Sequence, residues 1–199
     1  MLTNGFHDVP AGKVAAIVTG LQMFAPPVLR PEVDDPEWTL RRIDAPTPDE
    51  YLALYATVGR DWLWFSRLQM PPEELLAILR DPKIEVYRLE APGGETGILE
   101  LDFAETDTCE LAFFGVTKGL VGGGAARWLM NRAIQRAWSQ PIKRLWVHTC
   151  TFDHPNAVQF YIRSGFRPFY REVEVVDDPR LLGLAPPDSA PHIPVIRPA

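Results

Sequence analysis

Three consecutive glycines run directly into a segment with helical periodicity, and this arrangement constrains the fold more than any other part of the sequence. The glycines are Gly122–Gly124, and the segment AARWLMNRAIQRAW follows them. CELAFFGV (109–116) before the glycines and RLWVHTC (144–150) after the helix have the composition of strands. A strand, a crossover helix and a second strand favour a parallel pair. The apolar residues of the helix recur at the spacing of one buried face: Ala126, Leu129, Met130, Ala133 and Ala137.

Shorter periodic runs occupy most of the remaining chain. Strands are expected at 38–44, 83–90, 96–103 and 171–176. Helices are expected at 47–58, with Thr47 as the N-cap, and at 61–70, 71–80 and 153–166, where Gly165 provides a positive φ at the helix stop. The predicted fold class is α+β, with a mixed, mainly antiparallel sheet that contains one parallel pair and is flanked by helices.

One compact domain with two proline-rich ends is the organisation that the sequence predicts. A chain of 199 residues, 46% of them hydrophobic, can bury one substantial core. We expect an N-terminal extension at 1–37, the core domain at 38–176 and a proline-rich tail at 177–199. Within the extension, KVAAIVTGLQM (13–23) has the apolar content of a strand that joins either the core or a partner subunit. The two ends are also candidates for a homodimer interface.

Charge and cysteine content argue against several function classes. The formal net charge of -6 disfavours nucleic-acid binding, which needs a basic surface. No apolar run approaches the ~20 residues of a membrane span, and the first residues lack the features of a secretory signal, so we expect a cytoplasmic protein without membrane contact. Cys109 and Cys150 show none of the paired spacing of metal sites, so we expect reduced core thiols and no metal.

The glycine segment favours an anion ligand held by backbone amides. Gly119–Gly124 reads GLVGGG, without the Lys and hydroxyl residue of a nucleotide P-loop, and Gly122–Arg127 lacks the third glycine of a dinucleotide fingerprint. A glycine-rich turn at a helix N-terminus still lets N–H groups approach an anion such as a diphosphate. The alternative is that the glycines only permit a tight turn between strand and helix.

Two ordered motifs resemble the GNAT superfamily of acyl-CoA-dependent N-acyltransferases, over roughly Trp38 to Val176. That family's central motif is [Gln or Arg]xxGx[Gly or Ala], and the segment from Gly119 matches it at Gly122 and Gly124. Gly119 itself departs from the motif, because the family has a basic or amide side chain there. The second motif is an NxxAxxxYxxxGF-like helix, which HPNAVQFYIRSGF resembles with Asn156 and Tyr161. The segment WVHTCTFDHP also looks like one bacterial branch of the superfamily.

The resemblance implies that acetyl-CoA is the co-substrate and that its donor strand splays from its parallel neighbour. Free N–H groups of such a strand hold the pantetheine arm and polarise the thioester carbonyl. With Gly119 at the departing position, the diphosphate is expected to be bound mainly by backbone amides. Arg127 could compensate for the missing side chain, but a solvated surface arginine is the favoured interpretation. The cofactor-binding residues implied are Phe114, Val116, Gly119, Val121, Gly122, Gly123, Gly124, Ala125 and Asn156.

Acyl transfer to an amine requires a proton acceptor and a proton donor. A lysine-like amine of pKa ~10.4 must lose a proton before it attacks. Glu110, at the start of CELAFFGV, matches the glutamate that serves as general base in some family members, although an ordinary strand-edge carboxylate or a water-ordering role explains it equally. Tyr161 matches the family tyrosine that protonates the departing thiolate, and its alternative is a core aromatic residue.

The acceptor is expected to be an amine of a small molecule or peptide, bound beside early aromatic residues. Trp62, Trp64 and Phe65 lie where family members shape the acceptor pocket, although core packing explains them as well. His154 is a candidate acceptor residue, and His148 is either another or a structural histidine. The predicted function is an N-acetyltransferase. The alternatives are an enzyme with another acyl-CoA donor and a non-catalytic CoA-binding sensor or structural subunit.

Overall fold

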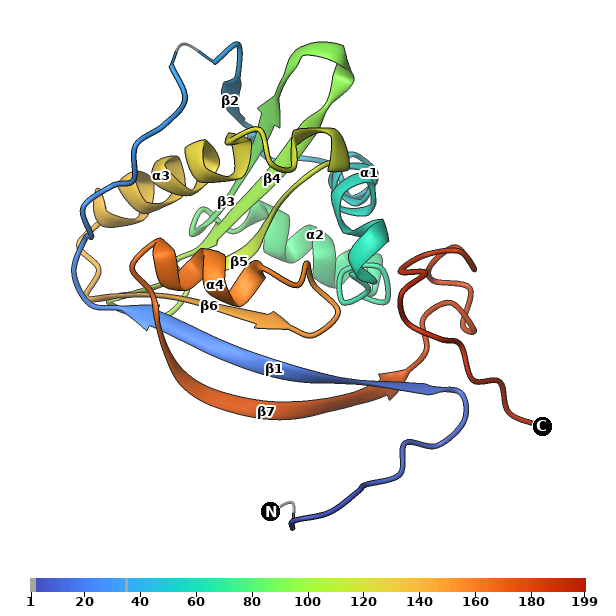
Figure 1. Ribbon diagram of the computed structural model, residues 1–199. Helices are drawn as coiled ribbons and strands as arrows, with labels where there is room; N and C mark the ends of the chain where they lie inside the picture. Colours follow the sequence, from blue (N-terminus) through green and yellow to red (C-terminus); the bar gives the residue numbers. More distant parts are fainter. Residues whose placement is uncertain (1–2, 35) are drawn as a thin grey trace.

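A single mixed sheet organises the chain. In the computed structural model, which describes residues 3–34 and 36–199, seven strands form one sheet in the order β2-β3-β4-β5-β6-β1-β7 (Figure 1). The β5–β6 pair is parallel and the other neighbours are antiparallel, which confirms the predicted fold class. The strands are β1 (Lys13–Met23), β2 (Thr39–Arg42), β3 (Ile84–Glu90), β4 (Thr96–Asp102), β5 (Thr108–Val116), β6 (Arg144–Cys150) and β7 (Arg167–Asp177).

The first strand of the chain lies inside the sheet, between the last two strands. β1 pairs with β6 from Val18 to Met23 and with β7 from Lys13 to Gln22. Of the two partners expected for 13–23, the structure shows the chain's own sheet. Glycine is required at position 20 of β1, which pairs with Tyr170 of β7, because a Cβ there would lie 1.8 Å from the Tyr170 ring. That ring therefore lies across β1.

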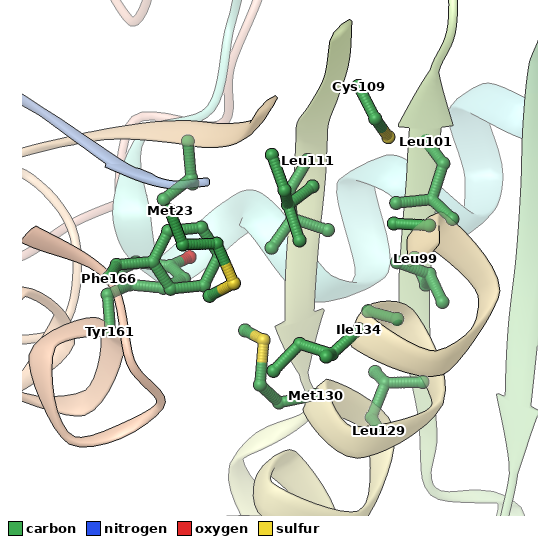
Figure 2. Packing of buried hydrophobic residues seen from close by; sticks show 14 of the residues in the cluster. Met23, Leu99, Leu101, Cys109, Leu111, Leu129, Met130, Ile134, Tyr161 and Phe166 are labelled. Atoms are coloured by element: carbon green, nitrogen blue, oxygen red, sulfur yellow. The ribbon is translucent and has the colours of Figure 1, made fainter. Parts of the chain in front are cut away.

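Two pairs of helices cover opposite faces of the sheet. On one face α1 (Pro48–Gly59) and α2 (Pro72–Arg80) pack on β3 and β4. On the other face α3 (Ala125–Trp138) packs on β4 and β5, and α4 (Ala157–Arg163) packs on β1 and β7. Figure 2 shows Leu129, Met130 and Ile134 of α3 directed at the sheet residues Leu99 and Leu111. Helix α1 begins as predicted, with Thr47 and Glu50 forming a reciprocal capping box.

The predicted helix at 61–70 is wrong. Only a short 3-10 turn, η1 (Arg60–Trp62), forms there, and Leu63 then takes a left-handed conformation with φ of 53°. The turn back directs Trp64 onto Gly59, where any Cβ would lie 2.5 Å from the tryptophan. Burial of the aromatic side chains against α1 and β5 therefore outweighs the helical propensity of the segment.

A buried ion pair fixes the segment after η1 to the sheet. Residues 62–65 of this region are called the aromatic segment below. Arg67 donates to Glu100 Oε1 at 2.5 Å, and the Tyr51 hydroxyl donates to Glu100 Oε2 at 2.5 Å. Glu100 on β4 is completely buried, and its desolvation raises the pKa of the carboxyl group against the influence of Arg67. Since a buried charge is costly when one partner is removed, this contact holds the segment after η1 in a defined position.

The C-terminal tail folds back onto β1. Asp178 and Arg180 form a buried pair at 2.8 Å, and the same guanidinium donates to the main-chain oxygen of Ile193 at 2.8 Å. Ala185 and Ala190 of the tail pack in a small cluster with Val14, Ala16, Leu63 and Phe152. The tail and the aromatic segment thus meet over the β1 end of the sheet.

Candidate functional site

The parallel strands β5 and β6 diverge, and a cavity opens between them. Their pairing covers Thr108 to Glu110 on β5 and Arg144 to Trp146 on β6. Beyond it, residues 111–116 of β5 and 147–150 of β6 line a cavity of about 460 Å³. β5 keeps its antiparallel partner β4 on the other side as far as Val116. This geometry leaves the β6-facing main chain of β5 available to a ligand.

The glycine segment forms one end of the cavity. After β5 the chain makes a short 3-10 turn, η3 (Lys118–Leu120), and then enters α3 through Gly124, which has φ of 93°. Gly122 also has a positive φ, of 85°, and both glycines line the cavity. A Cβ at Gly124 would lie 2.9 Å from Val33. The first turn of α3 contains no acidic residue, so its N-terminus remains attractive to an anion.

Gly119 lies outside the cavity lining, and a carboxylate occupies the place of its missing side chain. A Cβ at this position would lie 2.2 Å from Glu95 Oε1. The other oxygen of Glu95 accepts a hydrogen bond from the Thr117 hydroxyl. The loop therefore has an acidic neighbour at the position where the resembled motif has a basic or amide side chain.

Three arginines from separate segments line the same end of the cavity. They are Arg30 before β2, Arg127 in the first turn of α3 and Arg163 at the end of α4. The pKa of Arg30 is lowered by burial and then by repulsion from the other two arginines. Arg127 donates to the Pro31 carbonyl at 2.8 Å, while its buried Nε has no hydrogen-bond partner among the described residues. Such a cluster of like charges attracts an anion.

Tyr161 on α4 lines the cavity. The residue is only 7% exposed, and the rings of Phe114, Phe160 and Phe166 surround it at 5.6 to 6.3 Å. Burial raises the pKa of the phenol well above its usual value, so the hydroxyl stays protonated. Within the described part of the chain the hydroxyl has no hydrogen-bond partner. Asn156, at the N-cap of α4, also lines the cavity and makes no side-chain cap.

His148 and Glu110 form a hydrogen-bonded pair at the sheet wall. Glu110 Oε1 lies 3.1 Å from His148 Nδ1, and the imidazole lines the cavity whereas Glu110 lies beside it. The hydrogen bond to Glu110 raises the pKa of His148, and the negative charges of Glu110, Asp153 and Glu174 add to this effect against the influence of burial. The pair thus places a titratable nitrogen, supported by a carboxylate, at the cavity.

An aromatic wall lines the cavity beside Asp153. Trp64 packs on Tyr55 and Phe113, with ring centroids 5.4 Å apart in both contacts, and donates its Nε1 hydrogen to Asp153 Oδ1 at 3.1 Å. Asp153 Oδ2 accepts from the Thr149 hydroxyl at 2.6 Å and from the Cys150 main-chain N–H at 3.0 Å. Asp153 therefore joins the aromatic segment to the loop that precedes α4.

The histidines of the predicted acceptor pocket differ in their surroundings. Trp62 contacts the ring of His154 at 5.3 Å and that of His192 from the tail at 6.0 Å. His154 Nδ1 accepts from the main-chain N–H of Asn156 at 3.1 Å, while His148 faces Glu110. His154 is thus held at the start of α4.

Neither cysteine is suited to be a nucleophile. Both are free thiols, and Cys109 is buried in the core. Burial raises the pKa of the Cys109 thiol far above neutrality and that of Cys150, which lines the cavity, to about 12. A thiolate is the reactive form, so transfer through either sulfur is disfavoured at neutral pH.

The structure brings most of the expected site residues to one cavity. Those that line it are Tyr161, Phe114, Val116, Val121, Gly122, Gly124, Asn156, Trp62, Trp64, Phe65, His148 and His154. Those that lie outside its lining are Glu110, Gly119, Gly123 and Ala125. Sequence reasoning missed Arg30, Arg163, Asp153 and Glu174, which also line it. Only Asp153 could have been noticed from its local sequence, because it is a carboxylate between a strand and a short helix. The other three reach the cavity only through the topology of the fold.

Two other kinds of feature are absent from the described residues. In residues 3–34 and 36–199 no group of three or more His, Cys, Asp or Glu side chains is arranged to hold a metal ion. No helix within those ranges is long and apolar enough to cross a membrane.

Several solved structures share this fold at low sequence identity. A functionally unknown conserved protein from Staphylococcus epidermidis ATCC 12228 is 13% identical with a TM-score of 0.57, over 84% of this chain and 63% of that one. A GCN5-related N-acetyltransferase from Kribbella flavida is 17% identical with a TM-score of 0.55, over 86% of this chain and 63% of that one. The chain thus spans less than two thirds of either protein.

A third structure covers a smaller part of this chain. It is an aminoglycoside acetyltransferase, meta-AAC0020, from an uncultured soil metagenomic sample, 14% identical with a TM-score of 0.53, over 64% of this chain and 87% of that one. A comparison with curated proteins gave no significant match. The model of the acetyltransferase (GNAT) family matches residues 42–166, which include β5, the glycine segment, β6 and α4. The chain belongs to the GNAT acetyltransferase family.

Proposed function

We propose that this protein is an N-acetyltransferase that transfers the acetyl group of acetyl-CoA directly to an amine. The observation that carries the proposal is the cavity between β5 and β6, where the glycine segment and the unpartnered Tyr161 hydroxyl meet. Acetyl-CoA would supply an activated acetyl group as a thioester. The cavity of about 460 Å³ is within the usual size range of small-molecule sites.

The residues at the glycine end fit the phosphates of such a donor. Main-chain N–H groups between Val116 and Ala125 would bind the diphosphate, as the family resemblance implies. Arg30, Arg127 and Arg163 would supply the positive charge that position 119 lacks. The three guanidiniums repel one another, so a bound phosphate would relieve that repulsion.

Proton transfer is assigned to two groups on opposite walls. Because His148 lines the cavity and Glu110 does not, we assign His148 Nε2 as the acceptor of the amine proton, with Glu110 stabilising the imidazolium. Glu110 alone, acting through water, is the alternative. The Tyr161 hydroxyl would give its proton to the sulfur that leaves, and its high pKa keeps that proton in place until then.

A titration followed by a turnover assay tests the function. CoA, acetyl-CoA and longer acyl-CoAs are titrated in a thermal-shift experiment, and a panel of primary amines is then assayed through release of the free CoA thiol. We expect acetyl-CoA to stabilise the protein and at least one amine to be acetylated. Preference for a longer acyl-CoA would change the donor. Binding of CoA without any turnover across the panel would contradict the enzymatic proposal and favour a CoA-binding sensor.

A further inference from the structure

The charged side chains that line the cavity are separated by sign. All three arginines, Arg30, Arg127 and Arg163, are at the glycine end, where they act on one another. The two carboxylates, Asp153 and Glu174, are at the other end, where both act on His148 and Cys150. His148 also lies toward the carboxylate end, beside Glu110. A ligand at this second end therefore meets a negative field.

Glu174 is the carboxylate at this end that remains available. Asp153 is occupied by three donors, from Trp64, Thr149 and Cys150, and Glu110 beside the cavity is bound to His148. Glu174, on β7 opposite Ala16 of β1, forms no hydrogen bond or ion pair with any described residue. A half-buried carboxylate without a partner is a ready site for a cation.

The rest of this end is aromatic and held in place. Tyr55, Trp64 and Phe113 pack together there beside Asp153, whereas Trp62 also lies near Val116 and Val121 of the glycine end. Trp64 is fixed by its bond to Asp153 and by the Tyr55 and Phe113 rings. Aromatic faces bind both flat apolar groups and cations. Tyr161, whose hydroxyl has no hydrogen-bond partner among the described residues, lines the same cavity.

We infer that the carboxylate end of the cavity binds a cation with a flat apolar body, an arylalkylamine being the simplest example. The positive charge lies at Glu174 and the body lies against the Trp64 wall. Naming this molecule as the acetyl acceptor rests on the proposed function, whereas its binding does not. A neutral or anionic acceptor would leave Glu174 buried further without a partner, which is unfavourable.

Binding of ligands that cannot react tests the inference without any assumption about turnover. Phenethyltrimethylammonium carries a fixed charge and cannot be acetylated, and 2-phenylethanol is a neutral comparator with the same phenethyl body. Both are titrated by isothermal calorimetry into the wild-type protein. We expect the cation to bind about tenfold more tightly than the alcohol, because an ion pair and a cation–π contact together contribute on the order of 1–2 kcal/mol.

Two variants identify the carboxylate. Glu174→Gln is expected to remove the preference for the cation and to leave 2-phenylethanol binding unchanged. Glu172→Gln, on the same strand but outside the cavity lining, removes the same charge and is expected to keep the preference. Equal affinities for cation and alcohol, equal effects of the two variants, or no binding of either compound would each overturn the inference. Thermal unfolding of both variants verifies that they are folded.

Failure of this inference is distinguishable from failure of the proposed function. Acetyl-CoA titrations report on the glycine end, and the phenethyl compounds report on the carboxylate end. A protein that binds acetyl-CoA but shows no preference for the cation keeps the acetyltransferase proposal and loses only the acceptor class. A protein that prefers the cation but does not bind acetyl-CoA keeps the cation site and loses the acetyltransferase proposal.

Discussion

The two ends of the cavity are constructed in different ways. The glycine end comes mostly from one continuous stretch, residues 116–127, in which strand, turn and helix follow one another. The carboxylate end is assembled from segments far apart in the chain: the aromatic segment 62–65, β5, the loop after β6, and β7. A ligand site within one supersecondary unit has a sequence motif, whereas a site made by the sheet topology has none.

The difference also extends to the function of each end. The main chain dominates the glycine end, so its residue types are constrained by φ values and close contacts more than by chemistry. Side chains dominate the carboxylate end, so substitutions there can change specificity without changing the backbone. Tyr161 and His148 line the cavity and are the groups assigned to proton transfer, so the largest effects are expected from them.

Tyr161→Phe is expected to give the largest loss. The substitution removes only the hydroxyl, so the ring keeps its contacts with Phe114 and Phe166 and the fold is preserved. We expect kcat to fall by about 10³-fold, within the range for loss of a general acid, with unchanged affinity for acetyl-CoA. Steady-state kinetics and calorimetry measure the two quantities. Tyr87→Phe, on β3 and outside the cavity lining, is the matched control, and equal activity of both variants would refute the role of Tyr161.

His148→Gln is expected to lower kcat/KM by about 10²-fold, at the lower end of the range for a general base, because Glu110 can still accept a proton through water. In the wild type, Glu110 raises the pKa of His148, so the base is protonated and inactive on the acidic side. Activity should therefore rise with pH through a limb above about 6.5, the ordinary imidazole value.

The pH profile separates His148 from Glu110. Glu110→Gln removes the charge that stabilises the imidazolium, so the acidic limb should move to lower pH while most of the plateau activity remains. His148→Gln should abolish the limb. If Glu110→Gln instead eliminates activity while His148→Gln preserves both rate and profile, Glu110 is the base and His148 is structural.

The same contrast explains how much of the fold could be predicted. The strands and helices with clear periodicity, such as β4 and α3, were predicted almost to their ends, because their apolar positions have a single period. The sequence of β1 indicated a strand but not its neighbours, since the pairing with β6 and β7 depends on contacts about 130–160 residues away. The helix predicted at 61–70 was wrong because aromatic packing on Gly59 overrode local propensity.

Site residues that belong to a local sequence motif could be predicted, and those that come from distant segments could not. Gly122, Gly124 and Tyr161 belong to motifs, and the structure brings them together at the cavity. Arg30 and Glu174 are isolated charges in segments that indicated only a linker and a strand. Their roles depend on where β1 and β7 run, so a single sequence without its fold could not identify them.

Gly124→Ala is expected to weaken acetyl-CoA binding by about tenfold. At φ of 93° an alanine is strained by about 1–2 kcal/mol, and its Cβ would lie 2.9 Å from Val33, so the turn must shift. Gly183→Ala, in the tail, is the matched control, because its φ is 73° and a Cβ there meets nothing within 4 Å. Both variants should lose thermal stability through the strained φ, with the larger loss for Gly124→Ala because of the contact with Val33, and only Gly124→Ala should lose donor affinity. Equal donor affinity in the two would mean that the turn does not bind the donor.

The smallest effects are expected from the charged side chains around the glycine segment. Their variants test whether donor binding at this end depends on side chains as well as on the main chain. Arg30→Ala should weaken acetyl-CoA binding about threefold, and Glu95→Gln should strengthen it about twofold, as expected for partly exposed charges worth on the order of 0.5–1 kcal/mol. Both effects should shrink as salt is raised, because exposed charges are screened. Arg80→Ala, at the exposed end of α2, is the control.

An unchanged affinity of Arg30→Ala at low salt would show that Arg30 does not contribute, and the glycine end would then depend on its backbone with Arg127 and Arg163 as the remaining positive side chains. The expected losses would instead show that the end with the motif also depends on a residue about 90 positions away from it. In that case the family motif identifies where the donor binds, while the charge missing at Gly119 is replaced by side chains that the topology brings to the same place.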